Sequence, residues 1–197
     1  MEVKIAVLAS GAGSNFKALV EGETEPGVVD ILLTDNPNAG ALKLAAELGV
    51  EARYLYPGKY RTRFGIEEER LWADFLLDRG VQLICLAGLM RIIKGPLLDA
   101  YRGRMLNIHP SLLPAFPGLD AQGQAFSYGV KIAGCTVHYV DDGTDTGQII
   151  LQKAVPVLES DQRDSLAARI LLQEHEIYSK AVKAHCLGRA VYSKVIR

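Results

Sequence analysis

An asparagine and a histidine share one side of the extended sequence Leu106-Asn107-Ile108-His109, which continues the short extended run at 105–108. Asn107 and His109 are two residues apart, so in an extended chain their side chains point to the same side. Imidazole exchanges protons near neutral pH, and an amide N–H donates a hydrogen bond. Pro110 biases His109 to extended geometry and so orients its ring. The pattern predicts a general acid or base beside a hydrogen-bond donor, and a structural histidine is the alternative.

An acidic turn lies further along the chain, with the sequence Asp141-Asp142-Gly143-Thr144-Asp145. Because Asp and Gly are ordinary turn residues, a solvated hairpin tip explains Asp141 and Asp142. Asp145 comes directly before a strand-like run, which places its carboxylate at the inner end of the hairpin. A carboxylate within about 4–6 Å of an imidazole favours the charged ring. Asp145 is therefore a candidate to hold a histidine in its protonated form.

A glycine-rich turn follows the first apolar run and precedes a helical pattern. Glycine lets the backbone approach an anion closely, and the N-terminus of the next helix favours negative charge. The turn predicts a phosphate site at Gly13, Ser14, Asn15 and Phe16, with a plain turn capped by Ser14 or Asn15 as the alternative. A dinucleotide fingerprint would need a third glycine where the chain has Phe16, and the Gly-Lys-Ser/Thr of a Walker A loop is absent.

Glu174 falls on the apolar stripe of the C-terminal helical pattern, between Ile170 and Ile177. Because a carboxylate that faces inward needs a partner, we expect Glu174 to accept hydrogen bonds from the hydroxyl groups of a substrate. A boundary position whose head reaches water is the alternative. His138 lies inside a strand-like run, and we interpret it as a structural histidine that a neighbouring backbone group satisfies.

The elements that position these residues alternate between strand and helix in the first half of the chain. Apolar runs lie at 4–9, 28–33, 53–56 and 81–87, and helical patterns lie at 16–20, 39–48 and 67–77. The second half contains an irregular loop with prolines at 110, 114 and 117, two strand-like runs at 131–140 and 147–157, a long helix from an N-cap at 160–161 to 188, and a final strand at 190–196.

These elements predict an α/β fold with an open Rossmann-like sheet. The sheet is mostly parallel, the C-terminal hairpin is antiparallel, and helices cover both faces. Ligand sites in such sheets lie at the carboxyl ends of the strands. The turn after 4–9, the segment after 81–87 and the segment 107–110 all lie at such ends, so we expect them to converge.

The composition narrows the class of protein. The chain has 197 residues, with 22 Lys and Arg against 23 Asp and Glu, so no overall field gathers nucleic acid or an anionic membrane. The first ten residues lack the apolar run of a signal peptide, and we expect a cytoplasmic protein. Cys85, Cys135 and Cys186 are far apart and fit no metal-binding pattern, so we expect no metal and reduced cysteines.

Taken in order, these segments resemble the formyltransferase family that uses 10-formyltetrahydrofolate. The resemblance rests on IAVLASGAGSNF, LAGLMRII, LNIHPSLLPAFPG, GCTVHYV followed by DDGTDTGQIILQ, and QEHEIY, and it covers nearly the whole chain. It implies one formyltransferase domain, 1–197, with a phosphate-binding half at 1–104 and a catalytic and folate-binding half at 105–197. It also implies transfer of the formyl group from 10-formyltetrahydrofolate, a co-substrate, to the amine of glycinamide ribonucleotide in purine biosynthesis.

The resemblance implies roles for individual residues as well. The catalytic residues are Asn107, His109 and Asp145, which act through a tetrahedral intermediate without a covalent enzyme adduct. The ribonucleotide is held by Gly13, Ser14, Asn15, Phe16, Pro110 and Glu174. The folate is held by Arg63, Met90, Arg91, Ile92, Ile93, Asn107, Asp141, Asp142, Gly143, Thr144 and Asp145, with Arg63 preferred over Arg61 for the glutamate tail.

Three alternatives remain open from the sequence. A formyltetrahydrofolate hydrolase resembles the catalytic half, but such hydrolases carry an additional N-terminal domain and usually have His where this chain has Pro110. An NAD(P)-binding oxidoreductase domain would place Asp35 on a ribose and leave the catalytic trio without a role. A scaffold protein would likewise give these three residues no catalytic role. Both a monomer and a homodimer fit the sequence.

Overall fold

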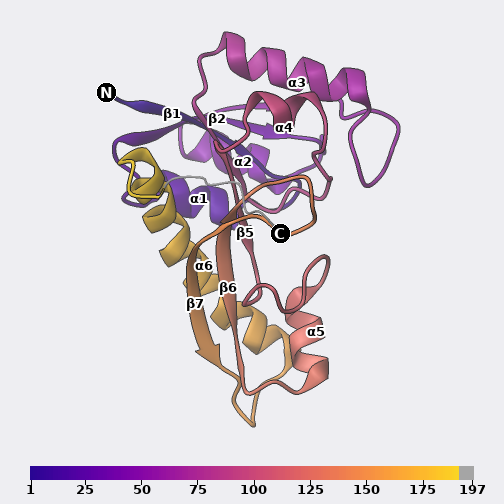
Figure 1. Ribbon diagram of the computed structural model, residues 1–197, viewed down its shortest axis with the longest axis vertical. Coiled ribbons are helices and arrows are strands. Elements are labelled where there is room, and N and C mark those ends of the chain that lie inside the picture. The colour runs from indigo at the N-terminus through magenta and orange to yellow at the C-terminus, as the bar shows by residue number, and fades with distance from the viewer. Residues whose placement is uncertain (191–197) are drawn as a thin grey trace.

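The computed structural model describes residues 1–190, and within them seven strands form one sheet (Figure 1). The strands lie in the order β3-β2-β1-β4-β5-β6-β7. Their bounds are β1 Val3–Leu8, β2 Gly27–Thr34, β3 Glu51–Tyr54, β4 Leu83–Leu86, β5 Met105–His109, β6 Ile132–Tyr139 and β7 Ile149–Pro156. Strands β1 to β5 pair in parallel, whereas β6 is antiparallel to both β5 and β7. The predicted mostly parallel sheet with an antiparallel hairpin is confirmed.

Helices cover both faces of this sheet (Figure 1). Their bounds are α1 Ser14–Glu21, α2 Gly40–Glu47, α3 Ile66–Asp78, α4 Pro96–Ala100, α5 Ala121–Tyr128 and α6 Arg163–Cys186. The side chains of α3 and α4 pack into one apolar core, and those of α1, α2, α5 and α6 pack into the other.

The two cores follow from the alternation of side chains along each strand. In β1, Ile5 and Val7 enter one core, whereas Ala6 and Leu8 enter the other. Every residue of β4 is buried, as expected for a central strand with helices on both faces. The carboxyl ends of β1, β4 and β5 are therefore fixed side by side in the middle of the sheet.

Several local predictions need correction. Neither Ser14 nor Asn15 caps α1, because the N-cap is Gly13 with a left-handed backbone. The N-cap of α6 is Gln162, which shares a capping box with Ser165, rather than the predicted Ser160-Asp161. Asp161 instead forms an ion pair with Arg169 at 2.7 Å. The predicted final strand at 190–196 lies almost entirely outside the described residues.

No pattern in the sequence predicted the helices α4 and α5. Helix α4 has only five residues and begins with a proline, which is too short for a periodic pattern. Helix α5 contains Gly123 and has little apolar segregation between its faces, so packing rather than pattern stabilises it. The predicted irregular loop with prolines at 110, 114 and 117 is confirmed, and it connects β5 to the unpredicted α5.

Candidate active site

Acceptor groups face both ring nitrogens of His109 at the end of β5. Nε2 donates to the carbonyl oxygen of Phe116 at 2.9 Å, and Nδ1 lies 3.3 Å from Asp145 Oδ2. Phe116 and Asp145 both have positive φ, 52° and 54°, which is uncommon for residues with a side chain. His109 is buried. A carbonyl oxygen and a carboxylate oxygen therefore face the two ring nitrogens, which fixes the orientation of the ring.

Asp145 lies between two histidines and a backbone donor. Its Oδ2 also accepts a hydrogen bond from the N–H of Gly118 at 2.8 Å, and its Oδ1 lies 3.7 Å from His138 Nε2. Burial favours the protonated carboxyl, but His138, the Gly118 N–H and the charge of His109 outweigh it and lower the pKa of Asp145. Asp145 is therefore an anion at neutral pH, in the position that the sequence predicted.

His138 completes the cluster from the neighbouring strand. It stands directly opposite Asn107 in the β5–β6 register, and Asn107 Nδ2 donates to His138 Nε2 at 3.2 Å. The other nitrogen, Nδ1, donates to the carbonyl of Tyr139 at 2.8 Å. The predicted backbone partner of His138 is thus confirmed. The interpretation as a purely structural histidine is incomplete, because Nε2 orients the Asn107 amide.

The residues proposed for a ribonucleotide lie where α1 and α6 meet. Asn15 Nδ2 donates to Glu174 Oε2 at 2.7 Å, although the two residues are 159 positions apart. Both side chains are buried, so Glu174 is not a boundary residue whose head reaches water. Burial raises the pKa of Glu174, and the bond from Asn15 opposes that rise. Within the described residues, Asn15 Oδ1 and His175 Nε2 are buried without a hydrogen-bond partner.

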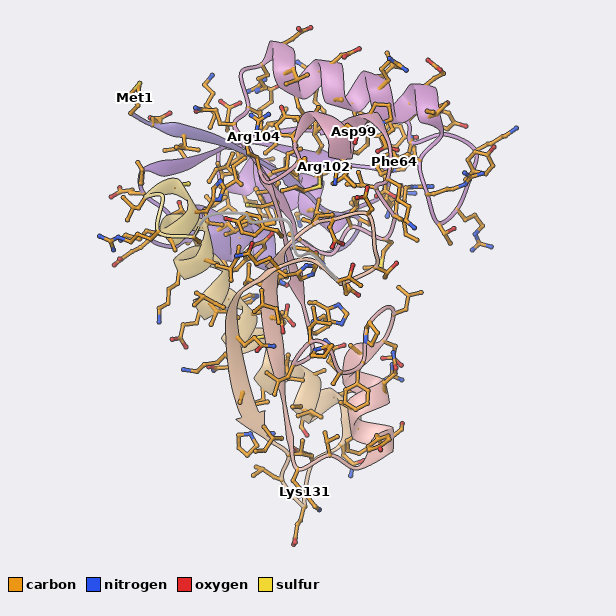
Figure 2. All side chains as sticks on the ribbon, in the orientation of Figure 1. Met1, Phe64, Asp99, Arg102, Arg104 and Lys131 are labelled. Carbon is orange, nitrogen blue, oxygen red and sulfur yellow. The ribbon has the colours of Figure 1, made fainter. Side chains whose placement is uncertain are left out.

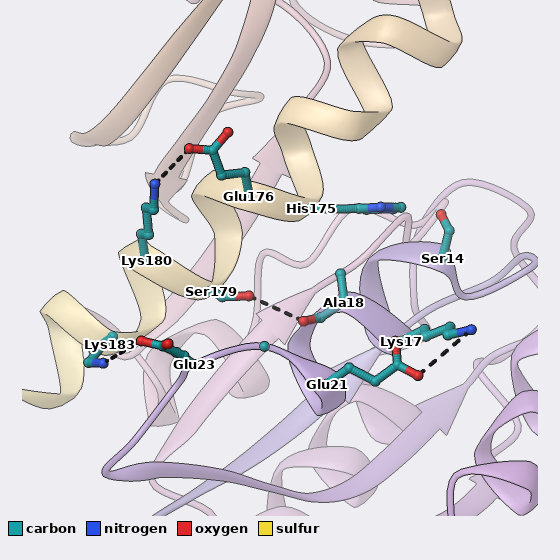
Figure 3. A pocket seen from close by; sticks show the side chains of 11 residues that line it. Ser14, Lys17, Ala18, Glu21, Glu23, His175, Glu176, Ser179, Lys180 and Lys183 are labelled. Carbon is teal, nitrogen blue, oxygen red and sulfur yellow. Dashed lines mark hydrogen bonds and ion pairs between the residues drawn. The ribbon is translucent and has the colours of Figure 1, made fainter.

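A cleft of about 740 Å³ opens beside this pair, between α1 and α6. Figure 3 shows His175 of α6 extending toward Ser14 at the start of α1. The lysines around the cleft are paired with neighbouring acids, as in Lys180–Glu176 at 2.6 Å. Among the residues that line the cleft, His175 has a buried ring nitrogen, Nε2, without a hydrogen-bond partner, and a polar ligand would satisfy it.

The shape of the glycine-rich turn depends on close packing against α2. Gly13 has a φ of 86°, and a Cβ atom there would lie 2.8 Å from the Cβ of Ala41. The Ala41 N–H also donates to the carbonyl of Gly11 at 3.1 Å. Any larger residue at position 13 would therefore be strained by its backbone and blocked by α2.

The proposed folate wall is built from segments at the ends of β4 and β6. Met90–Ile93 follow β4, and the bridge between Arg63 and Ile92 brings the loop at 57–65 beside them. The Arg63 guanidinium lies over the Tyr60 ring, 4.0 Å from its centroid. In the acidic turn, Asp141 Oδ1 accepts from the Gly143 N–H at 3.0 Å and from the Thr146 hydroxyl at 2.6 Å. Asp141 therefore has the structural turn role that its residue type favours.

Asp142 of the same turn forms a bidentate ion pair with Arg102, with N–O distances of 3.0 and 3.1 Å. Arg102 also reaches Asp99 near the end of α4, at 3.0 Å, and Figure 2 labels Arg102 and Asp99 close together. This pair joins the acidic turn to the segment that follows α4.

Asp35 follows β2, and both of its carboxylate oxygens are engaged. Oδ1 accepts from the Ser10 hydroxyl at 2.6 Å, and Oδ2 pairs with Arg91 Nε at 2.7 Å. A dinucleotide-binding domain would need this carboxylate for a ribose. The internal pair argues against that alternative.

A family model described as formyl transferase matches residues 3–182. The chain belongs to the formyl transferase family. It is 45% identical over 183 residues to the phosphoribosylglycinamide formyltransferase of Bacillus subtilis, with 91% of this chain and 93% of that protein covered. It is 40% identical to the human trifunctional purine biosynthetic protein adenosine-3, covering 95% of this chain but only 19% of that protein.

Solved structures of formyl transferase family members have the same fold as this chain. The glycinamide ribonucleotide transformylase 1 of Symbiobacterium toebii superimposes with a TM-score of 0.91 at 47% identity, covering 98% of this chain and 92% of that one. The expected α/β fold is that of this relative. In residues 1–190, no helix is long and apolar enough to cross a membrane, and no cluster of three or more His, Cys, Asp or Glu side chains is arranged to hold a metal ion.

The sequence of this formyl transferase indicated Asn107, His109 and Asp145 as candidates but not the contacts around them. The role of His138 follows from its place directly opposite Asn107, which no single-strand pattern reveals. The Asp35–Arg91 pair joins residues that are 56 positions apart, and neither segment signals the other. The structure brings together His109, Asn107 and Asp145 on one side and Asn15 and Glu174 on another, as predicted.

Proposed function

We propose that this chain transfers the formyl group of 10-formyltetrahydrofolate to the amine of glycinamide ribonucleotide, a step of purine biosynthesis. The observation that carries the proposal is the cluster of Asn107, His109 and Asp145, in a chain 45% identical to a phosphoribosylglycinamide formyltransferase across 93% of that protein. The cytoplasmic location and a monomeric or dimeric state stay predictions from the sequence.

The proposed chemistry is direct attack of the amine on the formyl carbon. The oxygen of the tetrahedral intermediate carries developing negative charge, which preorganised donors stabilise. Charged His109 and the amide N–H of Asn107 that is not used by His138 supply these donors. Asp145 compensates the charge on His109, so that the ring keeps its proton until the intermediate needs it. Water carries the proton that the amine loses to N10 of the folate, and collapse of the intermediate breaks the bond between the formyl carbon and N10, so that tetrahydrofolate leaves.

One geometric step must accompany catalysis. His109 Nε2 bonds to the Phe116 carbonyl, so a formyl oxygen has to replace that carbonyl as the acceptor. An apolar cavity of about 500 Å³, lined by Ser111, Phe116 and Tyr128 among others, lies between this loop and α5. It leaves the loop room to withdraw the Phe116 carbonyl from His109.

The ribonucleotide binds beside the trio in this proposal. Its phosphate meets backbone N–H groups of the turn at Gly13 to Phe16, at the positive end of α1. Its ribose hydroxyls meet Glu174 and the unpartnered Oδ1 of Asn15, which accepts a hydrogen bond but cannot donate one. Pro110 borders the same site, directly after His109. The buried, unpartnered Asn15 oxygen is the best support for a polar ligand here.

The folate binds on the other side of the trio. Backbone groups of Met90–Ile93 and of the acidic turn recognise its ring system, and Arg63 meets the glutamate tail. The engaged side chains of Asp141 and Arg91 support a recognition by backbone groups. No metal enters this proposal, because the two histidines and Asp145 act on protons and charge.

The decisive experiment supplies the purified protein with a 10-formyltetrahydrofolate analogue and follows the deformylated product by absorbance. Turnover that requires glycinamide ribonucleotide supports the transferase. Turnover without the ribonucleotide would instead identify a hydrolase. Absence of turnover in both cases would refute both activities.

A further inference from the structure

We infer that Asp35 and Arg91 form a positioning pair that fixes the folate wall of the active site. The inference rests on the proposed function, since it concerns the site that this function assigns to folate. The pair is partly buried, with side chains 7% exposed for Asp35 and 14% exposed for Arg91, and its Nε–Oδ2 distance is 2.7 Å. Neither residue touches the catalytic trio in the hydrogen bonds described above.

The Arg91 end of the pair holds the loop at 57–65. Arg91 Nη1 donates to the carbonyl of Arg63 at 3.1 Å and also to the carbonyl of Tyr60. The next residue strengthens the same contact, because the Ile92 N–H donates to the carbonyl of Thr62 at 2.9 Å. Four residues of a surface loop, 60–63, are thereby tied to the segment that follows β4.

The Asp35 end holds the start of the glycine-rich turn. Ser10 donates its hydroxyl to Asp35 Oδ1 at 2.6 Å, and the same hydroxyl accepts the Met90 N–H at 2.9 Å. The Ser10 N–H donates to the carbonyl of Gly88 at 3.2 Å. The ends of β1, β2 and β4 thus meet at one charged centre.

The physical reason for a positioning role is the cost of a buried charge. A guanidinium presents five donors in a fixed plane and cannot lose its proton. It therefore stays in a buried site only if acceptors surround it. Asp35 supplies the compensating charge, and two loop carbonyls supply the remaining acceptors. Without the Asp35 charge, Arg91 has to turn toward solvent and release the loop.

The consequence concerns folate more than the ribonucleotide. An Asp35→Asn variant keeps an oxygen that accepts from Ser10, so the glycine-rich turn retains its anchor. The same variant loses the charge that holds Arg91, so residues 60–63 and the backbone at 90–92 lose their mutual position. Recognition by backbone groups depends on that position, because small displacements cost binding.

The test compares steady-state kinetics of the full-length wild type with those of Asp35→Asn. We expect the KM for the folate donor to rise about tenfold, equivalent to about 1.4 kcal/mol. The kcat and the KM for glycinamide ribonucleotide should each stay within about threefold of the wild-type values. The pH profile of kcat should be unchanged. A double variant, Asp35→Asn with Arg91→Met, removes both charges and so avoids an unpaired buried guanidinium. Its folate KM should equal that of Asp35→Asn alone.

The matched control is Asp30→Asn, which alters an ion pair on β2, the strand that Asp35 directly follows. Asp30 pairs with Arg79, and their side chains are 21% and 25% exposed. This variant should lower the melting temperature without changing either KM. The inference is overturned if Asp35→Asn leaves the folate KM unchanged, if Asp30→Asn raises it equally, or if the two KM values rise together.

Direct binding of the folate analogue, followed by fluorescence, separates this inference from the proposed function. Wild-type protein that binds folate but transfers no formyl group to glycinamide ribonucleotide would contradict the proposed function alone. A tenfold weaker folate Kd in Asp35→Asn would still support the positioning pair.

Discussion

Replacing Asp145 by Asn tests the electrostatic reasoning at the active site most directly. The substitution keeps the size of the side chain and an oxygen that accepts the Gly118 N–H, but it removes the negative charge 3.3 Å from His109 Nδ1. At that distance and an effective dielectric of about 20, two unit charges attract by about 5 kcal/mol. Full loss of that attraction would slow a step that needs charged His109 by between about three and four orders of magnitude.

The asparagine amide dipole recovers part of this attraction, so we expect kcat to fall by about 100- to 1,000-fold, within the usual range for acid–base groups. The KM values should change little, because Asp145 does not hold either substrate by its charge in the proposed mechanism. Stopped-flow single-turnover kinetics measures the chemical step separately from product release. Asp99→Asn is the matched control, since Asp99 lies outside both proposed substrate sites with a side chain 70% exposed, and it should lower kcat by less than about threefold.

The pH dependence gives a second measurement on the same variant. Because the pKa of Asp145 is lowered, the wild-type carboxylate is charged throughout the range from about pH 5 to pH 8. The wild type should therefore lose the contribution of the Asp145 charge to kcat only below about pH 5, whereas the variant has no such loss. A variant with kcat within tenfold of the wild type would refute the assignment of Asp145 as the charge partner of His109.

Three further outcomes follow from the site and its surroundings. His109→Ala should lower kcat by at least about 100-fold while isothermal titration still detects binding of both substrates; near wild-type turnover would remove His109 from the mechanism. Glu174→Gln should raise the melting temperature at neutral pH, because burial raises the pKa of Glu174, and its contribution to stability is present at low pH and lost as the pH rises through that raised value. The gain should vanish below about pH 4 in differential scanning calorimetry, and a pH-independent gain would contradict the cause. Arg102→Ala should lower the free energy of unfolding by less than about 1 kcal/mol in urea, because its pair with Asp142 is exposed, and a larger loss would mean that the pair supports the whole acidic turn.

Much of the fold was predictable because its strands are continuous apolar runs. The run at 81–87 indicated a strand buried on both faces, and β4 occupies Leu83–Leu86 with every residue buried. The hairpin of β6 and β7 was predictable from two such runs around an acidic turn. Helix α5 was not, since its faces show little apolar segregation. Its Ala125 and Phe126 instead pack into the core that Phe116 and the α6 side chains share.

In the candidate site, too, local features were predictable and contacts between distant segments were not. Asn107 and His109 were predictable together because a spacing of two in a strand is a local property. The contact of His138 with Asn107 depends on the antiparallel register of β6 against β5, which is a property of the folded sheet. The N-cap prediction for α1 was wrong for a related reason. Gly13 is the N-cap, with a left-handed backbone, and the contact of this turn with Ala41 of α2 depends on the fold and not on the residues next to Gly13.

The packing of Gly13 against Ala41 has a consequence for how such sequences diverge. The two positions share one small space, since a Cβ on residue 13 would lie 2.8 Å from that of Ala41. A substitution at one of these positions is therefore tolerated only if the residue at the other position leaves room for it. Only position 13 belongs to the proposed phosphate site. In a broad set of descendants of this gene, position 41 should stay restricted to the smallest residues wherever the turn keeps its glycine. The range of residues found at position 41, which binds no ligand itself, would then indicate whether the neighbouring turn keeps the shape of the anion site.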